Sequence, residues 1–173
     1  VVLSVGRLAR VKDFPTLLRA IRQVSKNRPV RLIILGEGSW RMRLEKMARK
    51  LGVGAIVSLP GWVDNPYAFM SRASVLVLSS KREGLGNVLI EAMACGCPCV
   101  STNCPSGPAE ILESGRFGPL VPVGNASALA IAVERVLDCP PRKSMLLERA
   151  GDFSFNTSID HYECILFERV RYW

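Results

Sequence analysis

Residues 75–91, VLVLSSKREGLGNVLIE, contain the turn that decides the fold. The apolar run at 75–80 has the length of a buried strand, and the segment after Gly86 has apolar residues at helical spacing. A short turn with two glycines joins them. A strand that leads through such a turn into a helix is the repeating unit of a parallel α/β sheet. The stretch therefore predicts one such unit, with its helix running to about Cys95.

The same alternation of apolar runs and helical segments continues in both directions along the chain. The predicted strands cover residues 1–5, 30–35, 55–60, 75–80 and 97–103, with a shorter sixth strand at 118–123. The predicted helices include residues 14–27, 40–51, 67–73 and 127–138, the last capped by Asn125. No Gly/Ser linker divides the chain. We therefore predict one α/β domain over residues 1–173, a doubly wound, Rossmann-like parallel sheet of about six strands with helices on both faces.

Composition excludes several classes of protein. With 49% apolar residues in a chain of 173, a core can be buried, which argues against intrinsic disorder. No apolar run approaches the roughly 20 residues that cross a bilayer, and the first residues resemble no signal peptide. We expect a soluble, cytoplasmic protein. Because the chain begins inside a predicted strand and without Met, we also expect it to be a piece of a longer polypeptide.

Positive charge is concentrated in the first half of the chain. Residues 1–82 contain 16 Lys and Arg against 4 Asp and Glu, whereas residues 83–173 contain 7 against 11. This asymmetry predicts an anionic partner, and charge alone leaves open a nucleotide, a nucleic acid or an acidic membrane surface. Solvated cations on the backs of helices are the simpler explanation for part of it. The chain lacks a platform of interleaved basic and aromatic residues, so we do not expect nucleic-acid binding.

Six cysteines raise the question of disulfides or zinc. Four of them crowd into ten residues, at spacings that match neither a CxxC pair nor a zinc ribbon. We therefore predict buried free thiols and no metal site. The cysteines are Cys95, Cys97, Cys99, Cys104, Cys139 and Cys164.

Two glycines and two carboxylates mark the turn after the 75–80 strand. Gly84 and Gly86 let backbone N–H groups approach a ligand, and Asn87 can cap a helix whose positive end then faces an anion. Glu83 precedes this helix and Glu91 lies about one turn inside it, so they can touch different parts of one elongated ligand. They would accept hydrogen bonds from hydroxyls such as those of sugars and ribose. The alternative is a solvated Glu83 and a Glu91 that only complements the helix dipole.

A second cluster, Gly6, Arg7 and Lys12, follows the first strand. Two cations five residues apart can bracket a diphosphate, Arg through its bidentate fork and Lys as a point charge. A solvated basic loop is the commoner origin of such a pair. Residues 36–39, GEGS, lack the third glycine of the dinucleotide fingerprint and follow the second strand, so we interpret them as a sharp turn that lines the cleft.

Together these features resemble the C-terminal, donor-binding half of the family-4 (group 1) retaining glycosyltransferases, which have the GT-B fold. The segments that carry the likeness are, in order, VGRL, VKDF, LGEG, LPGWV, SSKREGLGNVLIEAMACGCPCVST, SGPAEIL and GPLVPVGNASALA. The E-x7-E motif is intact at Glu83 and Glu91. The resemblance implies a hexosyltransferase that takes a nucleotide-diphosphate sugar, most often UDP-linked, and needs neither cofactor nor metal.

The resemblance also implies roles for particular residues. Arg7 and Lys12 would bind the donor diphosphate and stabilise the leaving group. Glu83 would contact hydroxyls of the transferred sugar without acting as a nucleophile, and Glu91 would accept from the ribose hydroxyls. Arg7, Lys12 and Glu83 are thus the catalytic residues. The other donor-binding positions would approach base, sugar and phosphate closely, and they are Gly6, Gly36, Gly61, Trp62, Val63, Gly84, Leu85, Gly86, Asn87 and Val88.

A missing partner domain follows from the same resemblance. Family members have an N-terminal domain that binds the acceptor, so we expect this fragment to bind donor without transferring sugar. The terminal helix at 161–173 would cross back onto that domain, which leaves its apolar side chains exposed here. The implied acceptor is lipid-linked or a polysaccharide of the bacterial surface, and the implied place is the anionic inner face of the membrane. A stand-alone, non-catalytic sugar-nucleotide binding module and a GT-B-type sugar-nucleotide epimerase remain alternatives.

Overall fold

The computed structural model describes residues 1–168 and, within them, all side chains except those of residues 161, 167 and 168. Six parallel strands form one sheet in the order β3-β2-β1-β4-β5-β6. The strands are β1 Val2–Val5, β2 Leu32–Leu35, β3 Val57–Gly61, β4 Val75–Leu78, β5 Cys99–Thr102 and β6 Leu120–Val121. The chain order reverses where β1 lies beside β4. This is the doubly wound sheet that the sequence predicts.

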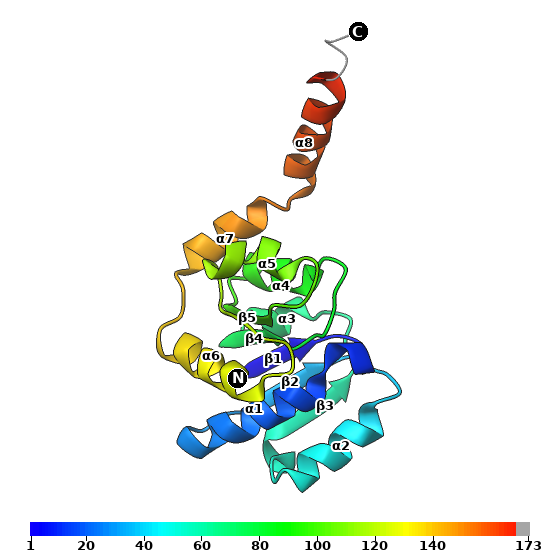
Figure 1. The fold of residues 1–173 in the computed structure, drawn as a ribbon, viewed down its shortest axis with the longest axis vertical. Coiled ribbons are helices and arrows are strands. Elements are labelled where there is room, and N and C mark those ends of the chain that lie inside the picture. The colour runs from blue at the N-terminus through cyan, green and yellow to red at the C-terminus, as the bar shows by residue number, and fades with distance from the viewer. Residues whose placement is uncertain (169–173) are drawn as a thin grey trace.

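Helices cover both faces of the sheet (Figure 1). The helices on one face are α1 Phe14–Asn27, α2 Arg41–Lys50 and α6 Ala126–Asp138. Those on the other are α3 Tyr67–Met70, α4 Asn87–Ala94, α5 Pro108–Ile111 and α7 Lys143–Gly151. Short 3-10 turns lie at Arg10–Lys12, Gly54–Ile56 and Glu113–Gly115.

The central strands are apolar on both sides because each face of the sheet has its own core. In β4, Val75 and Val77 pack into the core under α1, while Leu76 and Leu78 pack into the core under α4. All four side chains are buried. A strand covered by helices on both faces has no solvated side, which explains the continuous apolar run in the sequence.

The predicted elements are all found, although most of their bounds differ from the prediction by up to three residues. The third strand begins at Val57 rather than at residue 55, because Gly54–Ile56 form a 3-10 turn. The sixth strand is only Leu120–Val121. The predicted cap of α6 is confirmed, since Asn125 Oδ1 accepts a hydrogen bond from the backbone N–H of Ala128 at 2.9 Å.

The last helix, α8 Phe155–Glu168, projects away from the body of the molecule (Figure 1). Its exposed apolar side chains include Tyr162, Ile165 and Leu166. The predicted exposure of this helix is therefore confirmed for these three residues, while residues 169–173 lie outside the described residues. Within residues 1–168, no helix is long and apolar enough to cross a membrane.

The prediction of buried thiols is right for only part of the set. Cys97, Cys99 and Cys104 are buried, and burial raises the pKa of Cys97 to about 12. Cys95 is half-buried. Cys139 and Cys164 are exposed, because one follows the last residue of α6 and the other lies on the projecting α8.

Candidate functional site

The carboxyl ends of β1 and β4 lie side by side, because these strands are neighbours in the sheet. The loop that leaves β1 carries residues 6–12, and the loop that leaves β4 carries residues 79–86. In an open parallel sheet, the point where the strand order reverses is where ligands bind. Two hollows open there, and both are lined by Val5, Gly6 and Glu91. The structure thus joins the two clusters that the sequence singles out.

The first hollow, here called the glycine-turn hollow, has a volume of about 420 Å³. It lies against the turn between β4 and α4, where Gly86 has a φ of +91°, in the left-handed region that favours glycine. Asn87 and Val88, the first two residues of α4, line this hollow, and the start of a helix suits a phosphate-bearing ligand. The hollow is lined by Val5, Gly6, Lys12, Glu83, Gly84, Leu85, Gly86, Asn87, Val88 and Glu91.

Asn87 does not cap α4, so that prediction was wrong. The residue at the cap position is Gly86, and no side chain bonds to this end of the helix. Because left-handed Gly86 redirects the chain, Asn87 is already the first residue of α4. Its exposed side chain lines the glycine-turn hollow instead.

The second hollow, here called the Trp62 hollow, has a volume of about 530 Å³. The loops after β1, β2 and β3 form it. Trp62 is 76% exposed and Tyr67 is 52% exposed, and such aromatic faces can stack against a planar ring. The hollow is lined by Val5, Gly6, Arg7, Leu35, Gly36, Glu37, Trp62, Val63, Asp64, Pro66, Tyr67 and Glu91.

The two predicted cations fall in different hollows. Arg7 lines the Trp62 hollow, and Lys12 lines the glycine-turn hollow. Gly61 lines neither of them, although the sequence places it at the ligand. It is buried at the end of β3, where its carbonyl accepts a hydrogen bond from the N–H of Gly36 at 2.8 Å. Gly61 therefore holds the neighbouring turn, and the other predicted residues all line at least one hollow.

Two glycines permit the loops at this edge to pack backbone against backbone. Gly36 has a φ of +129°, and a Cβ there would lie 2.2 Å from the carbonyl oxygen of Gly6. Gly107, in the loop after β5, has a φ of +84°, and a Cβ there would lie 1.7 Å from the carbonyl oxygen of Leu85. The loop after β5 thus lies directly against the glycine turn. Gly107 lies in the SGPAEIL segment that carries the family likeness, but it is not among the predicted donor-binding residues.

Glu83 is held by two donors. Lys12 Nζ donates to Glu83 Oε1 at 2.7 Å, and Ser80 Oγ donates to the same oxygen. The side chains of Lys12 and Glu83 are 20% and 11% exposed. Lys12 therefore compensates the charge of a carboxylate that is largely withdrawn from water at the wall of the glycine-turn hollow.

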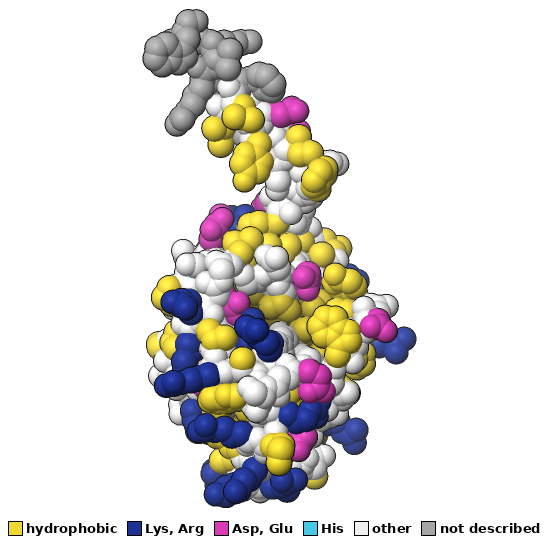
Figure 2. All heavy atoms as spheres, turned by 90° about the vertical axis from the view of Figure 1, so that its right-hand side faces the viewer, with side chains coloured by type: hydrophobic (Ala, Val, Ile, Leu, Met, Phe, Trp, Pro, Cys, Tyr) yellow, Lys and Arg dark blue, Asp and Glu magenta, His cyan; other side chains and the backbone are white. Residues whose placement is uncertain are grey.

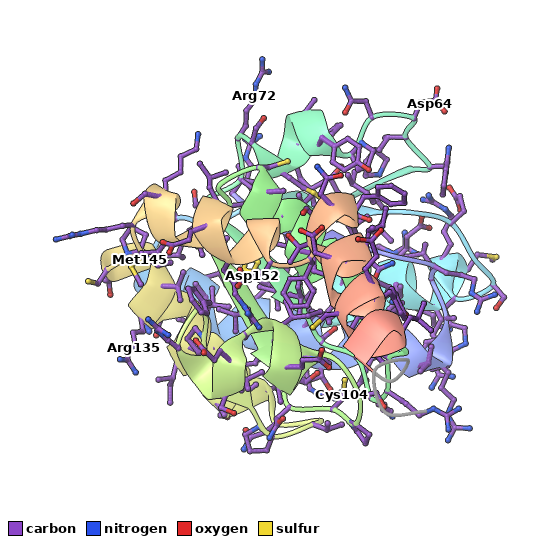
Figure 3. The ribbon with its side chains drawn as sticks, turned by 90° about the horizontal axis from the view of Figure 1, so that it is seen from above. Asp64, Arg72, Cys104, Arg135, Met145 and Asp152 are labelled. Atoms are coloured by element: carbon purple, nitrogen blue, oxygen red, sulfur yellow. The ribbon has the colours of Figure 1, made fainter. Side chains whose placement is uncertain are left out.

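A second ion pair lies at the rim of the Trp62 hollow. Arg41 donates hydrogen bonds to both carboxylate oxygens of Glu37, which holds the pKa of Glu37 below its usual value. Arg41 also donates to the carbonyl oxygen of Leu59 at 2.9 Å. Asp64, at the same rim, points outward from the edge of the molecule (Figure 3). Arg41 thus links Glu37, one of three acidic residues that line this hollow, to the end of β3.

Several lining residues were missed from the sequence. They are Val5, Leu35, Asp64, Pro66 and Tyr67, whereas Glu37 belongs to the 36–39 turn that the sequence places at the cleft. Asp64 and Tyr67 follow β3 closely, so the rule that loops after parallel strands collect at one edge could have found them. Val5 and Leu35 are apolar strand ends, which look like ordinary core residues in the sequence. Within residues 1–168, no group of three or more His, Cys, Asp or Glu could hold a metal ion.

Comparisons with known proteins identify the family of this chain. Residues 1–152 match the family described as "Glycosyl transferases group 1". The chain belongs to this family. Over 167 residues, this group 1 glycosyltransferase chain is 36% identical to the lipopolysaccharide core biosynthesis glycosyltransferase LpsE of Rhizobium meliloti (strain 1021). The alignment covers 94% of this chain and 48% of LpsE.

A second relative is the N-acetylgalactosamine-N,N'-diacetylbacillosaminyl-diphospho-undecaprenol 4-alpha-N-acetylgalactosaminyltransferase of Campylobacter jejuni (subsp. jejuni serotype O:2). It is 35% identical over 137 residues, which are 79% of this chain and 37% of the relative. The pneumococcal O-GlcNAc transferase GtfA, solved in complex with UDP and GlcNAc, has the same fold, with a TM-score of 0.84 and 21% identity. That match covers 96% of this chain and 35% of GtfA. The group 1 chain spans about half, or less, of the length of the curated relatives.

Proposed function

We propose that residues 1–173 form the donor-binding half of a retaining glycosyltransferase, a hexosyltransferase that takes a nucleotide-diphosphate sugar. The favoured donor is a UDP-hexose or UDP-N-acetylhexosamine. The observation that carries this proposal is the meeting of two unlike hollows at Glu91, one with exposed aromatic side chains and one at a helix N-terminus. A nucleotide sugar has the same two-part character, with a planar base at one end and phosphates and a sugar at the other.

The hollows suggest where each part of the donor binds. The base lies in the Trp62 hollow, against Trp62 and the backbone near Val63. The ribose hydroxyls donate to Glu91, which lines both hollows. The diphosphate and sugar occupy the glycine-turn hollow, beside Lys12 and the N–H groups at the start of α4. The complex of GtfA with UDP and GlcNAc supports this class of ligand for the fold.

The chemistry follows from the charges at the junction. The acceptor oxygen bonds to the anomeric carbon on the face from which the diphosphate leaves, and the leaving phosphate takes the acceptor proton. Negative charge develops on that phosphate as its bond to the sugar breaks, and Lys12 in the glycine-turn hollow and Arg7 in the adjoining Trp62 hollow supply positive charge to stabilise it. In this proposal no metal is required. Glu83 accepts hydrogen bonds from hydroxyls of the transferred sugar. Glu83 is not a nucleophile in this proposal. Retaining glycoside hydrolases use one carboxyl group as general acid and a second as nucleophile, and that division of roles is not carried over to Glu83 and Glu91.

The acceptor belongs to a second domain in this proposal. Because the chain spans only part of its relatives, transfer requires an N-terminal domain that binds a lipid-linked or polysaccharide acceptor. One relative is named for lipopolysaccharide core biosynthesis and another for a diphospho-undecaprenol acceptor, which supports a role in surface glycan synthesis.

The donor assignment is tested by calorimetric titration with UDP, GDP, ADP and UDP-N-acetylglucosamine in the absence of metal. Glu91→Ala is expected to weaken UDP itself by about tenfold or more, since hydrogen bonds to a charged acceptor contribute roughly 1.5–3 kcal/mol. Glu83→Ala is expected to spare UDP and weaken the sugar-bearing donor. Glu148→Ala removes an exposed carboxylate on α7 as the control. Failure of the unsubstituted chain to bind any of the nucleotides, or equal losses in both site variants, would contradict the assignment.

We also propose that the basic half of the chain meets an anionic membrane. On α1, Arg19, Arg22 and Lys26 share one exposed face and line a groove of about 570 Å³ that ends at Leu51. Within residues 1–168, none of these three cations has an acidic partner, which distinguishes them from Arg28, bound to Asp138. Lys and Arg gather over the half of the molecule that holds α2 (Figure 2). Anionic headgroups complement such a face.

The membrane proposal is tested by co-sedimentation with vesicles of phosphatidylglycerol and of phosphatidylcholine. Arg22→Gln with Lys26→Gln is expected to weaken binding to the anionic vesicles by roughly 30-fold at low salt, since each cation contributes about 1 kcal/mol. Arg72→Gln with Arg142→Gln removes the same charge elsewhere on the surface as the control. No sedimentation with anionic vesicles, or equal losses in the two double variants, would contradict the proposal.

A further inference from the structure

Two consecutive serines bond to opposite partners of the ion pair between Lys12 and Glu83. Ser79 Oγ donates to the backbone carbonyl oxygen of Lys12 at 2.8 Å. Ser80 Oγ donates to the carboxylate oxygen Oε1 of Glu83. Both serines follow the last residue of β4 and are almost fully buried, at 1% and 0% exposure. Ser79 therefore connects the loop after β4 to the loop after β1, while Ser80 bonds to Glu83 within the loop after β4.

The position of Ser80 is itself fixed by the neighbouring strand. Thr102, at the end of β5, is fully buried, and its Oγ1 donates to the carbonyl oxygen of Ser80 at 2.6 Å. On the other side, the backbone N–H of Lys81 donates to the carbonyl oxygen of Val11 at 2.8 Å. The backbone around Ser80 is thus held from both sides, and this fixes the direction of the Ser80 hydroxyl toward Glu83. A buried side chain with satisfied neighbours can orient another group accurately.

The bonds to Glu83 use only one of its two carboxylate oxygens. Lys12 Nζ and Ser80 Oγ both donate to Oε1. Within residues 1–168, no donor bonds to Oε2. Since an ionised carboxylate can accept about four hydrogen bonds, Oε2 keeps its full capacity to accept from a ligand. The glycine-turn hollow, which Glu83 lines, is where such a ligand hydroxyl would lie.

We propose that Ser80 is a positioning residue that ties Oε1 of Glu83 and so presents Oε2 to hydroxyls of the donor sugar. Without the Ser80 hydroxyl, Lys12 is the single remaining donor, and the carboxylate can turn about its side-chain torsions toward the flexible ammonium group. The sugar then loses a preorganised acceptor, whereas the nucleotide keeps its own contacts at Glu91 and the Trp62 hollow. Ser80 therefore determines preference for sugar-bearing donor over bare nucleotide. This inference rests on the donor site proposed above.

Replacing Ser80 by Ala tests this role with little disturbance of the fold. The substitution removes a donor, and Glu83 Oε1 keeps its bond from Lys12. Ser4→Ala is the matched control, because Ser4 is also buried, at 2% exposure, and its Oγ donates to the backbone carbonyl of Val77 at 2.7 Å. Both variants lose one buried hydroxyl and one hydrogen bond. Only Ser80→Ala loses a contact to Glu83.

The measurement is the ratio of the Kd for UDP to the Kd for UDP-glucose or UDP-N-acetylglucosamine, obtained by calorimetry. Ser80→Ala is expected to weaken the better-bound UDP-sugar by about tenfold while UDP stays within about twofold, and Ser4→Ala is expected to leave the ratio unchanged. An unchanged ratio in Ser80→Ala, or the same change in Ser4→Ala, would overturn the proposal.

A crystal structure of the Ser80→Ala chain gives a second test that needs no nucleotide. The proposal expects the Glu83 carboxylate to move away from the position that it has in the unsubstituted chain. A carboxylate that stays in place overturns the proposal. If the carboxylate moves but the unsubstituted chain binds neither UDP nor UDP-sugars, the positioning role stands and the proposed donor site fails.

Discussion

The contact between Gly107 and the glycine turn gives the sharpest prediction about how the site is built. Gly107 has a φ of +84°, and a Cβ there would lie 1.7 Å from the carbonyl oxygen of Leu85. Gly107→Ala therefore has two costs. A left-handed backbone costs an L residue roughly 1–2 kcal/mol, the ψ of −59° places Gly107 outside even that region, and forcing apart packed groups adds roughly 1–3 kcal/mol. The contact is between two backbones, so no flexible side chain can relieve it.

A substitution at a second glycine with positive φ gives a conformational cost without the clash. Gly124 has a φ of +76°, and a Cβ there would meet no atom within 4 Å. Gly124→Ala thus carries the conformational cost alone. In a domain of this size, a loss of 1 kcal/mol in the free energy of unfolding lowers the Tm by about 2–4 °C. We expect Gly124→Ala to lower the Tm by about 3–6 °C and Gly107→Ala to lower it by at least about 3 °C more.

The same pair of variants also predicts a difference in binding. Relief of the clash in Gly107→Ala has to displace Leu85, and with it the N–H groups between Gly84 and Gly86. Calorimetric titration with a UDP-sugar is expected to show weaker binding by Gly107→Ala and unchanged binding by Gly124→Ala. Equal Tm losses in the two variants would refute the reasoning, because they would mean that the loop after β5 does not support the glycine turn.

Two further predictions concern the rest of the fold. Asn125→Ala removes the cap of α6 and is expected to lower the free energy of unfolding by about 1 kcal/mol in a denaturant titration. Asn125→Asp retains the acceptor and is the control. Equal losses in the two variants would argue against the cap. Burial raises the pKa of Cys97 to about 12. A thiol reagent at pH 8 is therefore expected to label exposed Cys139 and spare Cys97 in the native chain. Labelling of both cysteines at equal rates, measured by mass spectrometry, would contradict this prediction.

The fold could be predicted because local patterns decide it. The continuous apolar run of β4 indicates a strand buried on both faces, and the glycine turn after it indicates a parallel unit. The weakest strand signal gave the largest error in bounds, since β6 has only two residues. The cap of α6 was predictable because one Asn side chain bonds to a backbone group three residues away.

The site was less predictable, because much of it depends on contacts between loops far apart in sequence. Gly107 acts through the backbone of Leu85, and nothing near residue 107 in the sequence signals that contact. Asn87 was misassigned for a related reason. An Asn at the start of a helix usually caps it, but the left-handed conformation of Gly86 advances the helix start by one residue. Rules based on neighbouring residues failed at positions where tertiary contacts determine the backbone conformation.

The order of the strands explains why the site combines a basic loop with an acidic one. The first half of the chain forms β1 to β4 together with α1, α2 and α3, and most of its Lys and Arg precede β3 in the chain. The second half of the chain forms β5 and β6, which follow β4 in the sheet, and β4 lies directly beside β1. Lys12 comes from the basic half and Glu83 is the first residue of the acidic half, and the reversal of strand order makes them neighbours at 2.7 Å. A ligand at this place therefore meets a cation and a carboxylate together, as a molecule with both phosphates and hydroxyls requires.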